Sequence, residues 1–339
     1  MSVSAAIFGL SGPRVTPEEA AFFRALDPWG FILFARNIES PDQVRVLTAT
    51  LRDLVGRADA PILIDQEGGR VQRLGPPQWP RYPAGRVYGA IAEPGERAAI
   101  TYLGGRLIAH DLHQLGINVD CLPVLDVPDP LGHEIIGDRA YAADPASVAD
   151  LGRAAAEGLL DGGVLPVIKH IPGHGRARAD SHLELPVVEA GVEDLEARDF
   201  RPFADLADMP LAMTAHVIYA AVDRLNPATT SPEVFQQVIR GRIGFDGLVM
   251  SDDLSMKALS GDFTARARDS LAAGCDVILH CNGDMAEMQA VAEGLGVLTG
   301  KSADRAAAAL ACIADGPDEF DPHEARARFD AAFDGAYAA

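Results

Sequence analysis

A polar loop at residues 169–182 gathers the side-chain types that acid–base chemistry needs. It reads KHIPGHG, then RARA, then DSH. The proline and the glycines favour a shaped loop over a regular helix. Because Asp180 and His182 are two residues apart, a turn can bring the carboxylate to one imidazole nitrogen and raise the basicity of the other. An isolated Asp-x-His is usually a surface pair, but in this loop we interpret it as a general acid/base.

A second candidate group follows the apolar run at residues 248–251. Asp252 and Asp253 come directly after it. A carboxylate just past a buried strand can point into a pocket, and a retaining glycosidase needs such a fixed carboxylate beneath the anomeric carbon. An aspartate there is also a common cap of the next helix. Both roles hold if one aspartate is catalytic and the other caps.

Two other chemistries use parts of the same loop. His170, His174, Asp180 and His182 are metal-ligand types, but a proline and a glycine keep the first two off one helical face. We therefore expect neither a metal nor another cofactor. Lys169 also suits a Schiff-base aldolase, because a buried lysine can have a lowered pKa. The acid–base pair in the same loop is not required by that chemistry, and borohydride trapping would distinguish the two.

The elements that must position these groups alternate between short apolar runs and longer amphipathic ones. Helices are expected at residues 41–55, 96–115, 145–160, 192–206 and 232–242. The apolar runs have the composition of parallel strands buried on both faces, and they lie at 5–10, 30–34, 61–65, 117–121, 165–169, 211–215, 248–251 and 277–280. This α/β alternation favours a closed (β/α)8 TIM-like barrel, although the sequence alone leaves an open sheet possible.

The alternation runs without a break in composition, so we expect a single catalytic barrel over residues 1–315. An alanine-rich helix is expected at 303–314, and Gly316 and Pro317 then interrupt the pattern. The tail at 316–339 is interpreted as a packing helix or a loose end.

Polar residues follow several of the expected strands abruptly. Asp65 ends the third, Lys169 and His170 end the fifth, His216 follows the sixth and Asp252 follows the seventh. The functional face of such a barrel is where the strands end, so these side chains are expected on one face.

Composition limits the partners. The chain has 339 residues and a formal net charge of −20, which makes nucleic acid and anionic membrane surfaces poor partners. The four cysteines form no CxxC pair, and we expect reduced thiols. The first ten residues lack the features of a secretory signal, and no apolar run is long enough to span a bilayer. A cytoplasmic protein is the simplest expectation.

Together these motifs resemble glycoside hydrolase family 3, and within it the short bacterial β-N-acetylhexosaminidases of cell-wall recycling. The matching segments are DQEGGRVQR at 65–73, KHIPGHG with DSH at 169–182, AHVIY at 215–219 and GFDG running into SDDLSM at 244–256. The segments GDRAY at 137–141 and GFILFARN at 30–37 also fit. Residues after 300 carry no such motif.

The resemblance implies roles for particular residues. Asp252 would be the nucleophile that forms a glycosyl-enzyme, and His182 would be the acid/base, oriented by Asp180 on a mobile loop. The first sugar subsite would be formed by Asp65, Arg73, Arg139, Lys169 and His170, and His216 is added as a substrate-binding candidate.

The implied substrate is N-acetylglucosamine β-1,4-linked to an anhydromuramic acid, with or without a peptide. The expected enzyme is a monomeric retaining β-N-acetylglucosaminidase. Two alternatives remain. A phosphorylase would intercept the same glycosyl-enzyme with phosphate, which a histidine acid/base repels less than a carboxylate does. A sugar-binding barrel without activity is the other, and turnover of a chromogenic glycoside would exclude it.

Overall fold

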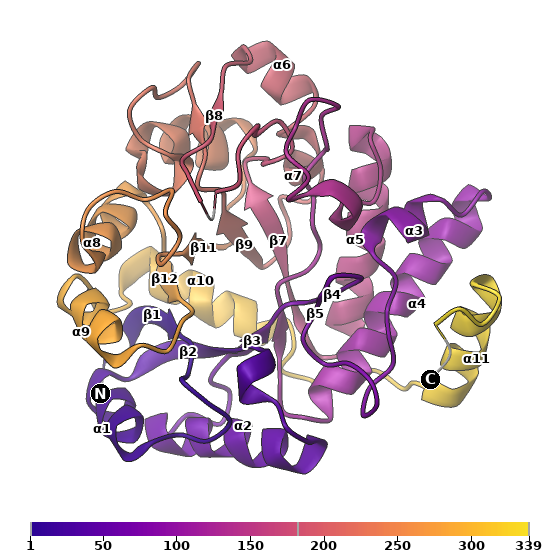
Figure 1. Cartoon of the computed structure of the whole chain (residues 1–339), viewed down its shortest axis with the longest axis horizontal. Coiled ribbons are helices and arrows are strands. Elements are labelled where there is room, and N and C mark those ends of the chain that lie inside the picture. Colours follow the sequence, from indigo (N-terminus) through magenta and orange to yellow (C-terminus); the bar gives the residue numbers. More distant parts are fainter. Residues whose placement is uncertain (1, 182, 338–339) are drawn as a thin grey trace.

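The strands at the centre of the molecule form a closed parallel barrel (Figure 1). The computed structural model describes residues 2–181 and 183–337. The barrel strands are β1 (Ser4–Phe8), β2 (Pro28–Leu33), β3 (Ile62–Ile64), β6 (Val119–Asp120), β7 (Leu165–Ile171), β9 (Leu211–Thr214), β11 (Leu248–Asp253) and β12 (Val277–His280). Each apolar run expected to be a strand overlaps one of them, and the predicted (β/α)8 barrel is confirmed.

Helices surround the barrel and connect consecutive strands. They are α1 (Pro17–Leu26), α2 (Pro41–Val55), α4 (Pro94–His113), α5 (Pro145–Asp161), α6 (Val192–Ala197), α7 (Arg201–Asp205), the π-helix η4 (Val234–Arg242), α8 (Phe263–Ala273) and α9 (Met285–Glu293). The Ser-Pro start expected for α2 is present, because the Ser40 side chain accepts a hydrogen bond from the backbone N–H of Gln43 and a proline follows it.

One expected helix, at residues 192–206, is divided into α6 and α7. The backbone leaves the helical path at Arg198, which has a φ of −127°. At this break Arg198 donates a 2.7 Å hydrogen bond to Asp129, and the neighbouring Asp199 accepts one of 2.6 Å from Arg176. The two side chains therefore bind loops at the open end of the barrel, which amphipathic periodicity does not reveal.

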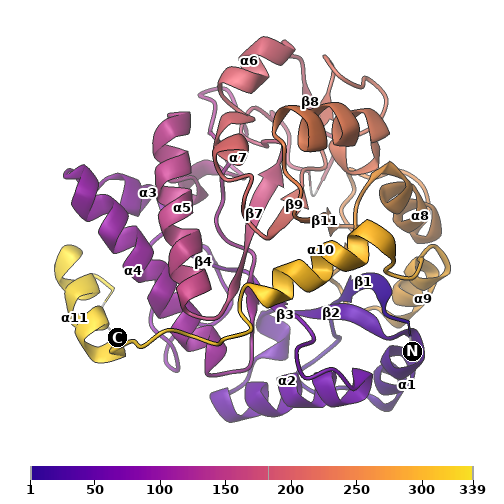
Figure 2. The same ribbon diagram turned by 180° about the vertical axis from the view of Figure 1, so that it is seen from behind.

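The amino-terminal end of the barrel is covered by α10 (Gly300–Ala311), which crosses in front of the strands when the molecule is seen from behind (Figure 2). Ala306 and Ala309 of this helix pack into the apolar cluster that fills the barrel interior. Arg305 forms ion pairs with Asp246 and Asp276, which stand just before β11 and β12. This end of the barrel is therefore closed, and a site has to open at the other end.

The last described helix, α11 (Pro322–Ala332), lies outside the ring and packs beside α4 (Figure 1). Phe329 is fully buried, with its ring 6.1 Å from that of Tyr82 and 6.2 Å from that of Tyr88. Arg326 donates a 2.7 Å hydrogen bond to the Tyr82 hydroxyl, which in turn donates one of 2.6 Å to Asp111 of α4. The tail thus holds a packed helix, while the domain boundary drawn at residue 315 stays a prediction.

Three of the cysteines, Cys121, Cys275 and Cys281, are buried, and all four are free thiols. In the described ranges, no helix has the length and apolarity that crossing a bilayer requires.

Replacing Phe329 with alanine should lower the free energy of unfolding by about 3–5 kcal/mol, because a fully buried ring leaves a cavity behind. Chemical denaturation measures this change. Leu225→Ala is the matched control, since Leu225 is 83% exposed and its truncation should change stability by less than about 0.5 kcal/mol. Equal unfolding free energies for the two variants would contradict a packing role for α11.

Candidate active site

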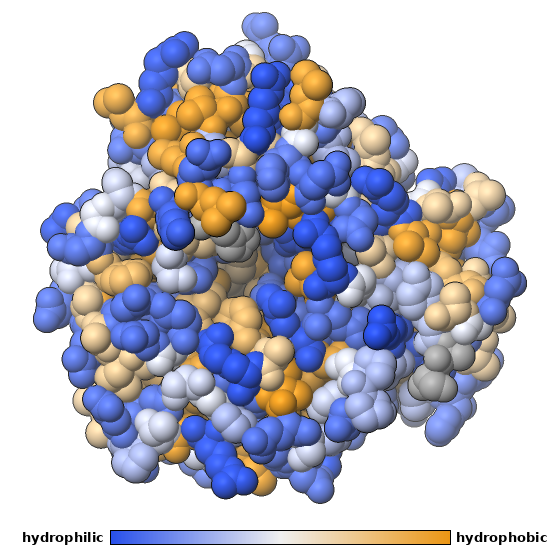
Figure 3. All heavy atoms as spheres, in the orientation of Figure 1, coloured by the Kyte–Doolittle hydropathy of each residue, from blue (hydrophilic) through white to orange (hydrophobic). Residues whose placement is uncertain are grey.

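A polar cavity of about 450 Å³ opens where the barrel strands end. Figure 3 shows the molecule from this side, with a hollow near the centre of the face and hydrophilic residues beside it. Apolar side chains form part of the cavity wall, among them Ile32, Phe34, Met213 and Leu279. Polar and charged side chains form much of the rest, and they include Asp65, Glu67, Arg73, Arg139, Lys169, His170, Asp252 and Asp253.

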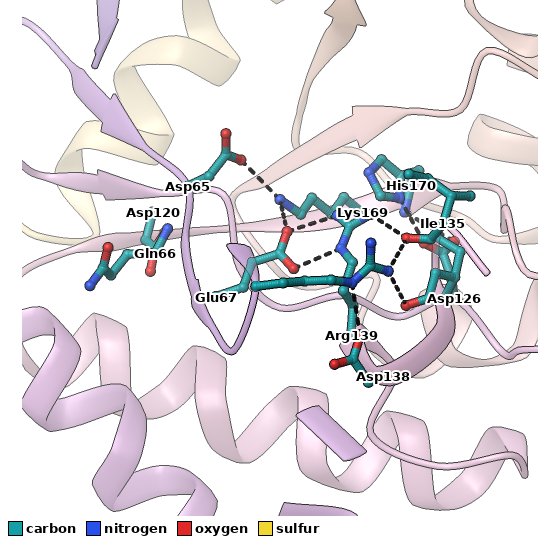
Figure 4. A network of polar contacts seen from close by, with 12 residues as sticks. Asp65, Gln66, Glu67, Asp120, Asp126, Ile135, Asp138, Arg139, Lys169 and His170 are labelled. Carbon is teal, nitrogen blue, oxygen red and sulfur yellow. Dashed lines mark hydrogen bonds and ion pairs between the residues drawn. The ribbon is translucent and has the colours of Figure 1, made fainter. Parts of the chain in front are cut away.

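A buried ion network joins two sides of this cavity (Figure 4). The ammonium of Lys169 lies 3.1 Å from Asp65 and 2.6 Å from Glu67. Arg73 donates a 2.9 Å hydrogen bond to the second oxygen of Asp65. Arg139 binds Glu67 through two hydrogen bonds, each of 2.8 Å. Three cations and two carboxylates therefore hold one another in place, and each has little freedom to move.

The local sequence explains why Asp65 and Glu67 face the same cations. Asp65 follows β3 directly, and Glu67 lies in β4 (Gln66–Gly68), which forms a hairpin with β5 (Val71–Gln72). Gln66 is fully buried, and its amide oxygen accepts hydrogen bonds of 3.0 Å from the backbone N–H groups of Arg73 and Leu74. Its side chain thus fixes the hairpin that returns Arg73 to Asp65.

The turn of this hairpin requires glycine. Gly68 has a φ of 92°, in a region that residues with a side chain rarely adopt. A Cβ atom at this position would lie 2.2 Å from the carbonyl oxygen of Pro83. The first glycine of DQEGGRVQR is therefore a steric requirement of the hairpin.

The cations decide the protonation states of the network. Burial alone would raise the pKa of Glu67, but Arg139 and Lys169 outweigh it and lower that pKa to about 2. Burial likewise opposes the ionised form of Asp65, and Lys169 and Arg73 hold its pKa well below the usual range. Burial would lower the pKa of Lys169, but Glu67 and Asp65 raise it above its ordinary value. A lysine held as ammonium is a poor Schiff-base nucleophile, which argues against the aldolase alternative.

A second buried carboxylate, Asp126, positions His170. One oxygen of Asp126 lies 2.6 Å from Nδ1 of His170, and the other accepts hydrogen bonds from the backbone N–H groups of His170 and His174 at 3.2 and 2.6 Å. Burial would raise the pKa of Asp126, but His170 outweighs this and lowers it to about 2. The ring of His170 is thus fixed at the cavity wall by an anion behind it.

The two aspartates at the end of β11 have different surroundings. Asp253 accepts 3.1 Å hydrogen bonds from the backbone N–H groups of Ser255 and Cys281, and the Ser255 hydroxyl also donates to it. It therefore caps a turn, whereas Asp262 caps the next helix, α8. Asp252 lines the cavity, accepts a 2.8 Å hydrogen bond from the backbone N–H of Asp253 and donates its own N–H to Thr214 at 3.3 Å.

The structure gathers Asp65, Arg73, Arg139, Lys169 and His170 around the same cavity as Asp252. His216 is not in the cavity wall. It is fully buried, with Nδ1 2.6 Å from the Thr229 hydroxyl and Nε2 3.1 Å from the carbonyl oxygen of Asp253. Its geometry suits holding the backbone beside Asp252 better than contacting a sugar.

The structure describes two of the three residues of the predicted acid/base motif, Asp180 and Ser181. His182 lies outside the described residues. The carbonyl oxygen of Asp180 accepts hydrogen bonds from the backbone N–H groups of Leu183 and Glu184 at 2.9 and 3.0 Å, which forms a turn. The pairing of Asp180 with His182 stays a prediction.

Comparison with known proteins identifies the family. The model of the "Glycosyl hydrolase family 3 N terminal domain" matches residues 15–310. The chain belongs to this family. It is a glycoside hydrolase, in agreement with the resemblance in its motifs.

Similar family 3 proteins cover most of the chain. A β-hexosaminidase from Methylococcus capsulatus is 42% identical over 281 residues, which are 81% of this chain and 82% of that protein. One from Alkalilimnicola ehrlichii is also 42% identical, over 282 residues that cover 81% and 80%. The crystal structure of NagZ from Neisseria gonorrhoeae with N-trifluoroacetyl-D-glucosamine is 32% identical, has a TM-score of 0.84 and is matched over 98% of this chain and 96% of that one.

Some residues that line the cavity or support its wall were not singled out from the sequence. Glu67 stands two residues after Asp65, so strand-like alternation could have placed both carboxylates on one side. Asp126 follows the apolar residues 124 and 125, which resembles the strand-end pattern of Asp65. Arg36 and Asn282 also line the cavity, but their motifs carry no local signal of that role.

Replacing Glu67 with glutamine should flatten the acid dependence of stability. The pKa of Glu67 is about 2 in the fold, against an ordinary value of 4.5, so its stabilisation is present above pH 4.5 and is lost as the pH falls toward 2. Glutamine does not titrate, and the free energy of unfolding of the variant should therefore fall less steeply over this interval. Urea denaturation at a series of pH values measures the slope.

Asp138→Asn is the control for this experiment, since the Asp138 side chain is 47% exposed and outside the buried network. It should keep the slope of the unmutated chain. An equally steep acid dependence in Glu67→Gln would mean that Lys169 and Arg139 do not hold Glu67 ionised. At neutral pH the glutamine variant should also be less stable, because two buried cations lose their charged partner.

Proposed function

We propose that this chain is a retaining β-N-acetylglucosaminidase that removes a non-reducing terminal N-acetylglucosamine. The observation that carries the proposal is Asp252 at the wall of a polar cavity, in a family 3 chain that matches β-hexosaminidases over four-fifths of its length. A solved family 3 β-N-acetylglucosaminidase from Paenibacillus, 29% identical with a TM-score of 0.85, supports the choice of sugar, although this chain covers 67% of that protein.

The charged cavity wall suits the recognition of sugar hydroxyl groups. Asp65 can accept hydrogen bonds from them, while Lys169, Arg73, Arg139 and His170 can donate. Because the ion network fixes four of these side chains and Asp126 fixes His170, they lose little conformational entropy when a sugar binds. We assign these five residues to the first sugar subsite.

In the first step, a carboxylate oxygen of Asp252 attacks the anomeric carbon, and the bond to the leaving oxygen breaks. His182, as imidazolium, gives its proton to that oxygen. A glycosyl-aspartate and a neutral imidazole result, with retention of configuration after the second displacement. Asp180 stabilises the imidazolium before the proton is transferred.

In the second step, the neutral imidazole of His182 takes a proton from water, and the water oxygen attacks the anomeric carbon. The bond to Asp252 breaks and the free sugar leaves. A histidine in this role does not repel the anionic Asp252, as the carboxylate of most retaining glycosidases would. His216 acts indirectly, because it holds the backbone carbonyl of Asp253 beside the nucleophile.

The natural substrate that we propose is N-acetylglucosamine β-1,4-linked to anhydromuramic acid, free or as a muropeptide. Similarity to NagZ and to several bacterial β-hexosaminidases supports this assignment. It implies action in the cytoplasm, where recycled wall fragments are degraded, and we expect the chain to work as a monomer.

Incubation with a 2-deoxy-2-fluoro glycoside that carries a good leaving group should trap the glycosyl-enzyme, because the fluorine slows the second step most. Mass spectrometry of peptides should place the label on Asp252. Asp253→Asn is the control, and it should still be labelled at Asp252. Label on Asp253, or turnover without any label, would overturn the assigned nucleophile.

Replacing His182 with alanine should reduce kcat/KM for a disaccharide by about 10²–10⁴-fold, since its leaving group needs a proton. An aryl glycoside with an activated leaving group should lose far less. Equal losses on both substrates would indicate a structural histidine. Product analysis with added phosphate completes the test, because a sugar phosphate in place of the free sugar would indicate phosphorolysis.

A further inference from the structure

His174 is a buried histidine that the proposed reaction does not use. The whole residue is 3% exposed, and its Nε2 atom lies 3.1 Å from the hydroxyl oxygen of Ser181, which is equally buried. Nδ1 of His174 is also buried and has no hydrogen-bond partner in the described part of the chain. Ser181 stands between Asp180 and His182 in the sequence, so this contact reaches the middle of the acid/base motif.

The His174 end of this contact is firmly held. Its backbone N–H donates to Asp126, the carboxylate that also binds His170. Its carbonyl oxygen accepts a 3.0 Å hydrogen bond from Ala177, and its ring lies edge-on to the ring of His170 at 5.8 Å. Just before it, the hydroxyl of Tyr219 donates to the carbonyl oxygen of Gly173 at 2.7 Å. His174 therefore cannot shift without disturbing the wall of the first sugar subsite.

The chain is also fixed at the base of the loop. Arg176 donates a 2.6 Å hydrogen bond to the fully buried Asp199. The carbonyl oxygen of Ala177 accepts one of 2.7 Å from the backbone N–H of His133. Arg178, the next residue, is exposed. Further along the loop, the hydroxyl of Ser181 contacts the ring of His174.

The imidazole of His174 keeps one protonation state at the pH where the enzyme would work. Burial lowers the pKa of His174 to about 4, although the anion of Asp126 opposes this shift. The imidazole is then neutral at neutral pH and has one N–H donor and one acceptor nitrogen. It can pair with a hydroxyl in either tautomer.

We propose that His174 is a positioning residue that fixes Ser181, the residue that directly precedes the proposed acid/base in the chain. This inference rests on the proposed function, because it assigns to His174 the placement of the acid/base of that reaction. Consecutive Cα atoms are about 3.8 Å apart, so a fixed Ser181 limits the reach of both of its neighbours. His174 thereby couples the first sugar subsite to proton transfer.

Ser181→Ala tests the proposal with the smallest change of volume. It should reduce kcat/KM about tenfold for a β-1,4-linked disaccharide, which corresponds to about 1.4 kcal/mol in the transition state. An aryl glycoside with an activated leaving group should lose less than about twofold, because bond cleavage there needs little proton transfer. The thermal midpoint should stay close to that of the unmutated chain. Ser147→Ala removes a hydroxyl on α5, away from the cavity, and should leave both substrates unaffected.

A double-mutant cycle then tests whether His174 and Ser181 act through one contact. If they do, adding Ser181→Ala to His174→Leu should cause no further loss on the disaccharide. His174→Gln, which can still form a hydrogen bond, should recover part of the activity. Independent, multiplying losses would overturn the coupling, and Ser181→Ala keeps the proposal testable if the His174 variants do not fold.

The outcomes separate this proposal from the function on which it rests. Suppose that the unmutated chain cleaves both substrates and is labelled at Asp252. If Ser181→Ala then shows no loss of kcat/KM, or an equal loss on both substrates, the positioning role is wrong and the function stands. If the unmutated chain cleaves neither substrate, both proposals are overturned.

Discussion

The site depends on one buried cation, the ammonium of Lys169, which lies between Asp65 and Glu67. Each of these charges would be costly to bury alone, and each is tolerable because the others are present. Lys169 belongs to β7, while the two carboxylates follow β3, so the contact spans the cavity floor between strands that are not neighbours in the barrel. Arg139, from the loop after β6, completes the connection.

Asp126 is a second buried charge that holds several parts of the site in place. A single buried carboxylate binds the side chain of His170 and the backbone of His174. The first residue faces the proposed sugar subsite, and the second contacts Ser181 of the proposed acid/base motif. In the proposed reaction, sugar binding and proton transfer would therefore share one rigid support, and a change at Asp126 should affect both.

The barrel was predictable because its strands are continuous apolar runs, and several of the helices between them have clear start signals. The ends of α2, for example, were predicted to the residue. The break between α6 and α7 was not, because it results from the tertiary contacts of Arg198 and Asp199. Periodicity reports burial along one segment, and it contains no information on a partner in a distant loop.

The cavity residues were predictable where a polar side chain directly follows a strand. Asp65, Lys169, His170 and Asp252 do line one cavity, as their positions after apolar runs indicated. His216 follows the same pattern but lies behind the wall, because its ring nitrogens bind Thr229 and the backbone of Asp253. Glu67 and Asp126 were missed since their importance comes from the cations and histidines that the fold brings to them.

The helix α10 across the far end of the barrel has a consequence for the way a polymer can be handled. The barrel interior is filled by packed side chains and closed by Ala306 and Ala309, so the described residues leave no passage through the barrel. A saccharide can enter the blind cavity only by one end and must back out by the same mouth. The barrel itself therefore offers a bound polymer no exit at its far end.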